Sequence, residues 1–291
     1  MHAACCNTFS CAAILRDQQG RFKMGKSVVL VGCGNMGYAM LKGWIASGKL
    51  AASDTTVVEP NDGLRERAAA LGVNTATKAD EVSPSAGFIV FAVKPQIIRD
   101  IAPAYASHTG KATFISVVAG LGTAGFEEML GRHASVMRCM PNTPAAIGKG
   151  MMVLFSNRNV TEEAKQFASE LLATSGAIAT IENEELMDAV TAVSGSGPAY
   201  VFHFIECLTA AGEKAGLPKD TAKLLAMQTV YGAANLAKES DEEPGRLREQ
   251  VTSPNGTTAA ALNILMGDNR LLDLVTEAVE AARRRSIELG K

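Results

Sequence analysis

The chain has 291 residues, of which 47% are hydrophobic and 20% charged, and its formal net charge at neutral pH is −2. These values are ordinary for a globular protein with one large or two modest domains. A nearly neutral chain without a block of like charge is not expected to bind nucleic acid or an anionic membrane surface. No run reaches the roughly 18 apolar residues of a membrane span.

Residues 1–26 are predicted to form a disordered N-terminal extension. The segment carries Arg16, Arg21 and Lys23, but its apolar stretch at 12–15 is too short for the core of a signal peptide. Met24 stands just before a clean strand, which favours an upstream start codon or a tail. A cleaved targeting segment is the alternative.

Short apolar runs alternate with helical stretches from Ser27 to about Ile181. Strands are predicted at 28–31, 56–59, 87–93, 113–118 and 135–140, with a sixth at 150–155, and helices at 36–47, 62–71, 96–106, 123–130 and from the N-cap Thr161 to about 173. This alternation predicts an α/β fold, with a parallel sheet covered by helices on both faces.

A glycine motif, Gly32-Cys33-Gly34-Asn35-Met36-Gly37, follows the first strand and opens the first helix. Gly32 permits a tight turn, Gly34 lets the backbone approach a pyrophosphate, and Gly37 allows close packing of helix and strand. The motif in this context predicts a Rossmann-type dinucleotide-binding domain over residues 27–182. A glycine turn without a ligand is the alternative.

Glu59 ends the second strand, about 20 residues after the glycine motif, where an acid accepts hydrogen bonds from the ribose 2′-hydroxyl and repels a 2′-phosphate. Asn61 and Arg65 follow closely and could hold a phosphate instead. An exposed glutamate that points away from the ligand is a further possibility. The sequence therefore leaves NADH and NADPH open as the cofactor.

Further strand ends are expected to complete the nucleotide site, because ligands of such sheets bind at the carboxyl ends of strands. The segments concerned are Ala92-Val93-Lys94-Pro95, Ala119-Gly120 and Met140 to Pro144, which includes Asn142. Lys94 is interpreted as a cofactor contact rather than a catalytic group.

Strand signals end near Glu182, and residues 183–291 are predicted to form an all-α domain for substrate binding and dimerisation. Helices are expected at 184–193, 198–215, 219–238, 244–250, 257–266 and 270–289. Apolar side chains point in every direction from the helix over 198–211, so it is expected to be buried all round. A helical region this small with a buried central helix indicates a core completed by another subunit.

Two segments rich in hydroxyl and small residues stand at predicted helix starts, Ser194 to Tyr200 and Thr252 to Thr258. Free backbone N–H groups and hydroxyls at a helix N-terminus can hold a carboxylate without a charged side chain. These segments therefore predict a binding site for a small carboxylic acid.

The four histidines offer no clear acid or base. His108 and His133 are predicted to lie on the surface. His203 is predicted to be a packed, hydrogen-bonded core residue, and Glu206, one turn later, could pair with another buried polar group.

Six cysteines occur without the spacing of a zinc site, so no metal is expected. Cys33 falls in a predicted glycine turn and Cys207 in a predicted helix. They are typical of reduced thiols in a cytoplasmic protein.

The glycine motif, Ala92 to Pro95, Arg138 to Pro144, Ser194 to Tyr200 and Ser253 to Thr258 occur here in one order. Together they resemble the pyrroline-5-carboxylate reductase family from about Ser27 to the C-terminus. The resemblance implies reduction of L-1-pyrroline-5-carboxylate to L-proline by hydride transfer from NADH or NADPH, the last step of proline biosynthesis. It also implies a homodimer with interwoven helical domains, which in many members assembles further into a decamer.

The resemblance also implies roles for the second hydroxyl segment. Ser253, Gly256 and Thr257 are expected to bind the substrate carboxylate. Thr258 is expected to hydrogen-bond the ring nitrogen and to help deliver its proton. Asn255 stands where the family usually has glycine, but asparagine tolerates left-handed backbone better than most residues.

Ser194, Ser196 and Gly197 are implied to lie nearby and shape the site. Because an iminium already accepts hydride well, strong general-base machinery is unnecessary. A β-hydroxyacid dehydrogenase is the nearest rival, yet Lys214 and Lys223 lack the asparagine expected one turn later. Reductases of other imines, or a non-catalytic dinucleotide-binding protein, are further alternatives.

Overall fold

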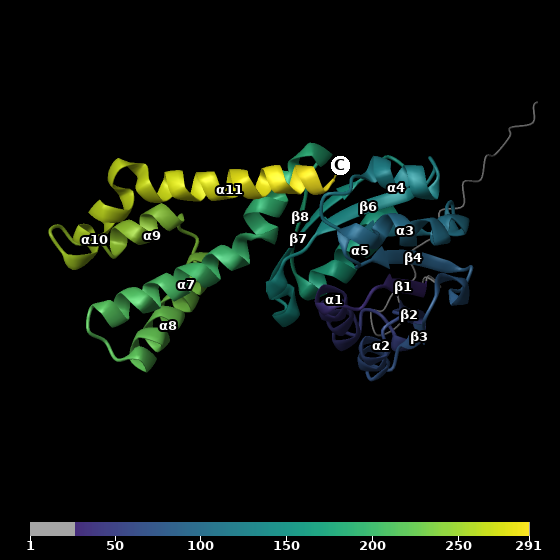
Figure 1. The fold of residues 1–291 in the computed structure, drawn as a ribbon, viewed down its shortest axis with the longest axis horizontal. Helices are drawn as coiled ribbons and strands as arrows, with labels where there is room; N and C mark the ends of the chain where they lie inside the picture. The colour runs from purple at the N-terminus through teal and green to yellow at the C-terminus, as the bar shows by residue number, and fades with distance from the viewer. Residues whose placement is uncertain (1–26, 291) are drawn as a thin grey trace, which may run out of the picture. The chain divides into compact units, whose positions relative to one another are not determined.

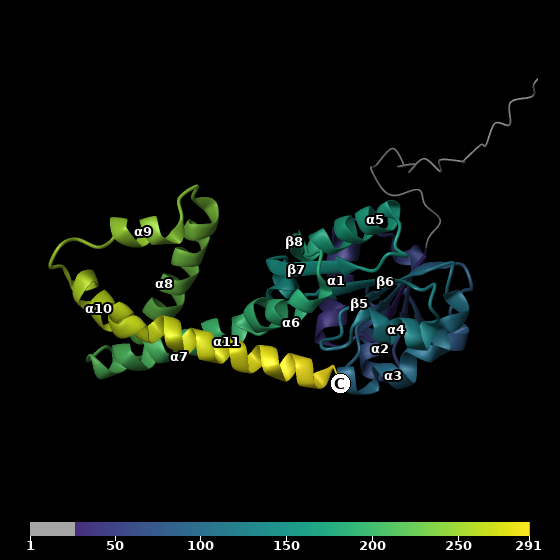
Figure 2. The ribbon, with the colours of Figure 1, turned by 90° about the horizontal axis from the view of Figure 1, so that it is seen from above.

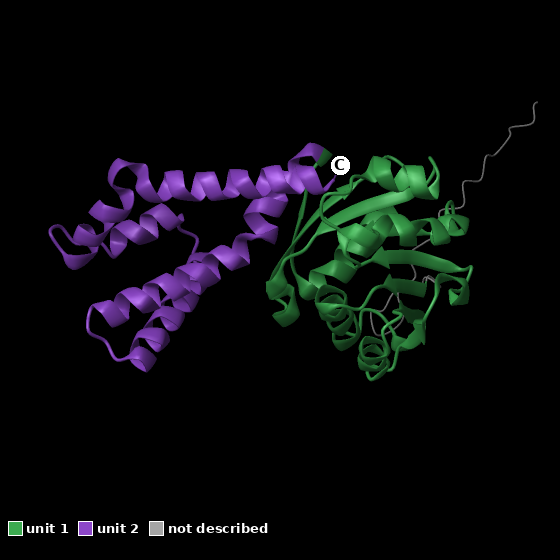
Figure 3. Cartoon of the chain, in the orientation of Figure 1, with its two compact units in different colours: residues 1–184 green, residues 185–291 purple. Residues whose placement is uncertain are grey.

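The computed structural model describes residues 27–290, so the predicted extension over residues 1–26 lies outside the described residues. The chain divides into two compact units, one ending at Glu184 and the other beginning at Glu185 (Figure 3). Among residues 27–290, no helix combines the length and apolar character needed to cross a membrane.

The first unit is built on one eight-stranded sheet with the order β3-β2-β1-β4-β5-β6-β7-β8 (Figure 1). Its strands are β1 (Ser27–Val31), β2 (Thr55–Val58), β3 (Asn74–Ala76), β4 (Ala86–Phe91), β5 (Thr113–Ser116), β6 (Ser135–Met140), β7 (Gly150–Ser156) and β8 (Gly176–Thr180). Neighbouring strands pair in parallel except β6 and β7, which are antiparallel. The sheet confirms the predicted Rossmann-type class, and its order reverses between β1 and β4, where such folds bind nucleotides.

Helices cover both faces of this sheet, as predicted. They are α1 (Asn35–Ala46), α2 (Asp62–Ala69), α3 (Ile98–Ile101), α4 (Thr123–Leu130) and α5 (Glu162–Leu172). Side chains alternate along β1, so Leu30 joins a core with Trp44 of α1, while Val31 joins the opposite core with Phe126 of α4. Each face of the sheet is therefore sealed by its own apolar layer.

Three parts of this unit differ from the prediction. The strands β3 and β8 were not predicted, because β3 buries only one residue and β8 none, so neither forms an apolar run. The helix predicted at 96–106 is instead two 3-10 segments, Pro95–Ile97 and Ala102–His108, flanking α3. Pro103 lacks an N–H and interrupts the regular helix.

The prediction that His108 lies on the surface was wrong. Its exposed fraction is 6%, and its Nε2 lies 3.3 Å from the carbonyl oxygen of Ser83. The last 3-10 turn carries the ring inward against the segment before β4, a tertiary contact that residue type alone does not predict.

The second unit is entirely helical. Its helices are α6 (Met187–Val190), α7 (Gly197–Lys214), α8 (Lys219–Glu239), α9 (Pro244–Gln250), α10 (Thr257–Met266) and α11 (Arg270–Leu289), with a π-helical turn over Thr191–Gly195. Helices α7 and α8 follow each other in sequence and contact each other (Figure 1), and in the view of Figure 2 α8 leads away from α7 toward α9. Gly216 follows the C-cap of α7 in a left-handed conformation with a φ of 99°, which glycine adopts without a steric penalty.

Within one chain, α7 is not buried as predicted. Val201, Phe202 and Phe204 expose 46–58% of their surface. His203 is likewise exposed rather than a core residue, and its Nδ1 lies 3.0 Å from Oε2 of the equally exposed Glu206. The reason is that α8 covers one side of α7, while apolar residues occupy every side.

Candidate functional site

The glycine motif forms a cradle between β1 and α1. Gly32 has a φ of +89°, and a Cβ there would lie 2.7 Å from the carbonyl oxygen of Ala92. A Cβ on Gly37 would lie 2.4 Å from the carbonyl oxygen of Gly32, whereas a Cβ on Gly34, the N-cap of α1, would meet no atom within 4 Å. The backbone is thus tightly packed at Gly32 and Gly37 and open at Gly34. This arrangement fits a pyrophosphate bound at the N-terminus of α1.

A cavity of about 660 Å³ opens beside this cradle at the carboxyl ends of β1, β2 and β4. Six predicted cofactor residues line it, namely Gly32, Gly34, Glu59, Ala92, Val93 and Lys94. Its wall also includes Ile101 and Tyr105 from the segment after β4, which supply apolar surface. An apolar wall with a few polar groups suits one end of a dinucleotide.

Glu59 is held inside this site rather than pointing away from it. It is 7% exposed, and its Oε2 accepts a hydrogen bond of 2.8 Å from the Cys33 backbone N–H. Its Oε1 accepts one of 3.0 Å from the Asn61 N–H. The carboxylate therefore ties the glycine loop to the start of α2, and each oxygen retains a lone pair for a ribose hydroxyl.

Cys33 is buried in the glycine loop, and it takes part in the site through its backbone N–H, which donates to Glu59, rather than through its thiol. Burial raises the pKa of the thiol above its ordinary value, an effect only partly offset by the positive charge of Arg67. The side chain therefore stays neutral at physiological pH and adds no negative charge beside the expected phosphates.

Arg67 is a residue of this site that the sequence did not reveal. Its NH2 donates to the Cys33 carbonyl oxygen at 2.8 Å, and its guanidinium stacks 4.0 Å from the Tyr38 ring centroid. Arg67 therefore stabilises the glycine loop through the Cys33 carbonyl. The two residues lie 34 positions apart, and no local sequence pattern connects them.

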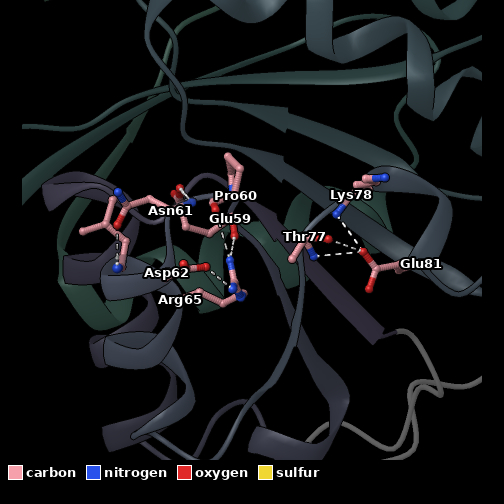
Figure 4. Close-up of polar contacts among 9 residues, drawn as sticks. Glu59, Pro60, Asn61, Asp62, Arg65, Thr77, Lys78 and Glu81 are labelled. Carbon is pink, nitrogen blue, oxygen red and sulfur yellow. Dashed lines mark hydrogen bonds and ion pairs between the residues drawn. The ribbon is translucent and has the colours of Figure 1, made fainter.

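Thr77 and Lys78 also line the cavity and were missed because β3 was not predicted. Glu81 organises this turn, since its Oε1 accepts from the Thr77 hydroxyl at 2.6 Å and from the Lys78 N–H at 3.0 Å (Figure 4). These hydrogen bonds, led by that of the Thr77 hydroxyl, hold the pKa of Glu81 below its ordinary value.

The other predicted cofactor residues lie outside the lining of this cavity. Asn35 and Met36 begin α1, Pro95 begins a 3-10 turn, and Gly120 adopts a left-handed φ of 82° next to Ala119. The Oδ1 of Asn142 accepts a hydrogen bond of 2.9 Å from the Met151 N–H. Their contact with a cofactor stays a prediction.

A network around Glu184 fixes the end of the loop that carries Ala119 and Gly120. The Glu184 carboxylate accepts from the Thr123 N–H at 2.7 Å and from its hydroxyl at 2.6 Å, so it caps α4. The same carboxylate lies 3.0 Å from NH1 of Arg138, which is 5% exposed. The last residue of the first unit therefore satisfies a buried guanidinium and a helix N-terminus together.

In the second unit, the loop before α10 has the features of an anion site. The Gly256 N–H donates to the Ser253 carbonyl at 3.0 Å, and Asn255 between them has a φ of 58°. The left-handed region is open to asparagine, so the departure from glycine leaves the turn intact. A Cβ on Gly256 would lie 2.4 Å from the Ser253 hydroxyl, so only glycine lets that hydroxyl close over the turn.

This turn leaves donors free at the start of α10. Gly256 is the N-cap and has no side chain, and the first intrahelical bond is donated by Ala260. The N–H groups of Thr257 and Thr258 therefore have no partner within the helix. Together with nearby hydroxyls they form a neutral site suited to a carboxylate.

The other hydroxyl segment is held by a π-helical turn. The Ser196 N–H donates to the Thr191 carbonyl at 2.8 Å, and the Tyr200 hydroxyl donates to the Ala192 carbonyl at 3.1 Å. Pro198 stands in the first turn of α7. Such π-turns often accompany functional sites, and this one sets where Ser194 lies.

A Rossmann-type cradle at the N-terminus of α1, in a chain that also carries a hydroxyl-rich turn at the start of α10, is typical of a dinucleotide-dependent oxidoreductase. Residues 27–120 match the family described as NADP oxidoreductase coenzyme F420-dependent, and residues 184–289 match pyrroline-5-carboxylate reductase dimerisation. The chain is 38% identical to the pyrroline-5-carboxylate reductase of Pseudomonas aeruginosa over 268 residues, covering 91% of this chain and 97% of that protein. The chain belongs to the pyrroline-5-carboxylate reductase family.

Solved structures agree with this assignment. The pyrroline-5-carboxylate reductase of Coxiella burnetii superposes with a TM-score of 0.87 at 33% identity, covering 92% of this chain and 100% of that one. The Plasmodium falciparum pyrroline carboxylate reductase, solved with NADP bound, superposes with a TM-score of 0.80 at 32% identity, covering 91% and 98%.

Proposed function

We propose that this chain reduces L-1-pyrroline-5-carboxylate to L-proline with NADH or NADPH, as the last step of proline biosynthesis. The observation that carries the proposal is the Ser253-to-Thr258 turn at the N-terminus of α10, in a chain that also holds a dinucleotide cradle. A site of hydroxyls and N–H groups recognises a carboxylate, and the substrate is a small cyclic imine that carries one.

In this proposal Ser253, Gly256 and Thr257 bind the substrate carboxylate and set the orientation of the ring. Thr258 donates a hydrogen bond at the ring nitrogen and helps to supply its proton. The bound dinucleotide supplies a hydride from C4 of its nicotinamide to the imine carbon. As that C–H bond forms, the π-electron pair of the C=N bond moves to nitrogen, and the product carries the new N–H.

The nucleotide residues have the roles that their positions support. Gly32, Gly34 and Gly37 allow close approach and packing, Glu59 meets the ribose, and Lys94 contacts the cofactor from the end of β4. The residues proposed to bind the nucleotide belong to the predicted domain 27–182, and those proposed to bind the imine belong to the predicted domain 183–291.

We further propose that the helical domain forms a homodimer, and that dimers assemble into a decamer. The support is the exposed apolar surface of α7 and the match of this domain to the dimerisation family. A cytoplasmic location is supported by Cys33, Cys139 and Cys207, all of which are free thiols.

The experiment is oxidation of NADH and of NADPH, measured separately, when L-1-pyrroline-5-carboxylate is added to the purified protein, with L-proline quantified as product. Turnover that yields L-proline is expected with at least one nucleotide. Nucleotide binding without turnover of this imine would contradict the proposal. Reduction of NAD+ or NADP+ when a β-hydroxyacid is added would instead support the dehydrogenase alternative.

A further inference from the structure

Arg65 of α2 contacts the backbone of Glu59, the residue proposed to bind the ribose, and its guanidinium is already engaged. Its NH1 donates to the backbone carbonyls of Glu59 at 2.9 Å and of Pro60 at 3.1 Å. Its NH2 forms an ion pair of 2.5 Å with Oδ1 of Asp62 (Figure 4). The two carbonyl oxygens thus hold NH1 of the guanidinium, and the carboxylate of Asp62 holds NH2.

The charges around this position disfavour a second phosphate. Glu59 places one buried carboxylate at the cavity, and this carboxylate accepts hydrogen bonds from two neutral backbone N–H groups. Asp62, the first residue of α2, neutralises Arg65. A 2′-phosphate, the group that distinguishes NADPH from NADH, carries about −1.5 to −2 charges and therefore meets one carboxylate and an occupied guanidinium.

We infer that Asp62 is a positioning residue for cofactor choice, which holds Arg65 away from a 2′-phosphate and makes NADH the preferred cofactor. The inference rests on the proposed function, because it assumes that a nicotinamide dinucleotide occupies this cavity. Glu59 accepts from the ribose hydroxyls, and Asp62 acts only through Arg65. Lys78 lines the same cavity, and because every variant retains it, its positive charge does not change the comparison between them.

An exposed ion pair three residues apart on a helix contributes little to stability. Asp62 is 82% exposed and Arg65 22% exposed at the side chain, so the role of the pair is geometric rather than stabilising. Because NH1 is held by the backbone carbonyls of Glu59 and Pro60, loss of Asp62 leaves NH2 beside Glu59 without its carboxylate partner. A free guanidinium edge is a strong donor to phosphate.

The test is the Asp62→Asn variant of the full chain. Dissociation constants for NADH and NADPH are measured by titration without substrate, and kcat/KM for each with L-1-pyrroline-5-carboxylate. The parent is expected to favour NADH. The variant is expected to bind NADPH about tenfold more tightly, the effect of one charge-assisted hydrogen bond, with NADH affinity nearly unchanged.

Three controls separate this role from a general charge effect. Glu66→Gln removes one negative charge from an exposed position of the same helix and is expected to leave the NADPH-to-NADH ratio unchanged. Asp62→Glu keeps the carboxylate and is expected to keep the parent ratio. In an Arg65→Gln background, Asp62→Asn is expected to have no effect on the ratio.

A parent that prefers NADPH would overturn the inference. So would an unchanged ratio in Asp62→Asn, or an equal shift in Glu66→Gln or in the Arg65→Gln background. If no variant turns over the imine although all bind nucleotide, the proposed function fails, while the affinity ratios still decide the role of Asp62.

Discussion

The two units of this chain treat their large apolar residues in opposite ways. In the sheet unit Trp44, Phe88 and Phe114 are completely buried, whereas in the helical unit Phe202 and Leu224 expose 58% and 67% of their surface. Burial of apolar surface is the main favourable term in folding, so the sheet unit has a finished core and the helical unit does not. The dinucleotide-binding fold is thus complete within one chain, whereas the exposed apolar surface of the helical unit agrees with the match of residues 184–289 to a dimerisation family.

The largest effect is expected when charged residues are placed on the exposed apolar face of α7, which tests whether this face forms the oligomer interface. The double variant Phe202→Asp, Phe204→Asp is expected to lose the oligomer and imine turnover while retaining NADH affinity. Each buried aromatic at such an interface contributes about 2 kcal/mol or more. Mass in solution, nucleotide titration and turnover are the measurements.

The matched control is Lys238→Asp, a charge change at an exposed position of α8. It is expected to leave the mass and turnover as in the parent. An intact, active oligomer in the double variant would show that α7 is not part of the interface.

The next largest effect is expected in the Ser253-to-Thr258 turn, which is proposed to bind the substrate carboxylate. Thr258→Ala is expected to lower kcat about ten- to a hundredfold, as for loss of one hydrogen bond that strengthens in the transition state, with nucleotide affinity unchanged. The comparison is Thr276→Ala, whose hydroxyl donates at 2.7 Å to its own helix at Leu272. Equal kinetics for the two variants would remove Thr258 from the mechanism.

The self-contained stability of the sheet unit depends on Glu184. Glu184→Ala leaves the guanidinium of Arg138 buried without its carboxylate and uncaps α4. Breaking a buried pair costs several kcal/mol, and because Glu184 is 26% exposed we expect about 2 kcal/mol, seen as a lower unfolding midpoint. The exposed Glu182 provides the control: an equal loss in Glu182→Ala would contradict the role of the network.

A smaller effect is expected at Asn255, where φ is 58°. Asn255→Gly is expected to retain KM for the imine, because glycine adopts this conformation freely. Asn255→Ala is expected to raise KM several-fold, since the left-handed region costs a residue with a Cβ about 1 kcal/mol. Identical KM values for the glycine and alanine variants would show that the turn is not required for substrate binding.

The smallest effect is a pH dependence at Glu81, whose pKa is held below its ordinary value. A lowered pKa means that the ionised group stabilises the fold above its ordinary pKa, and that this contribution disappears as the pH falls through the lowered value. Glu81→Gln is therefore expected to be slightly less stable than the parent at neutral pH and equal to it in acid. Urea unfolding at both pH values measures this, and a difference that persists in acid would contradict it.

Many helix bounds and caps could be predicted because they depend on residues that lie close together in the sequence. The bounds of α4, α9, α10 and α11 match their predicted ranges, and the predicted cap Thr161 accepts from the Ala164 N–H at 3.2 Å. The glycine cradle likewise follows from a motif read in one stretch of chain.

The remainder depends on contacts between residues distant in sequence. No spacing rule connects Glu59 to the Cys33 N–H, or Glu184 to Thr123 and Arg138. The exposure of His203 differs from the prediction for another reason, because apolar surroundings in the sequence do not say which chain supplies the covering surface.

The central claim is hydride transfer from a nicotinamide dinucleotide to the imine carbon of L-1-pyrroline-5-carboxylate. It is tested most directly by NADH carrying deuterium at both C4 positions, followed by mass spectrometry of the proline formed. The account predicts L-proline with a single deuterium on the carbon that was part of the C=N bond. Proline without deuterium, or oxidation of the nucleotide without proline, would contradict it.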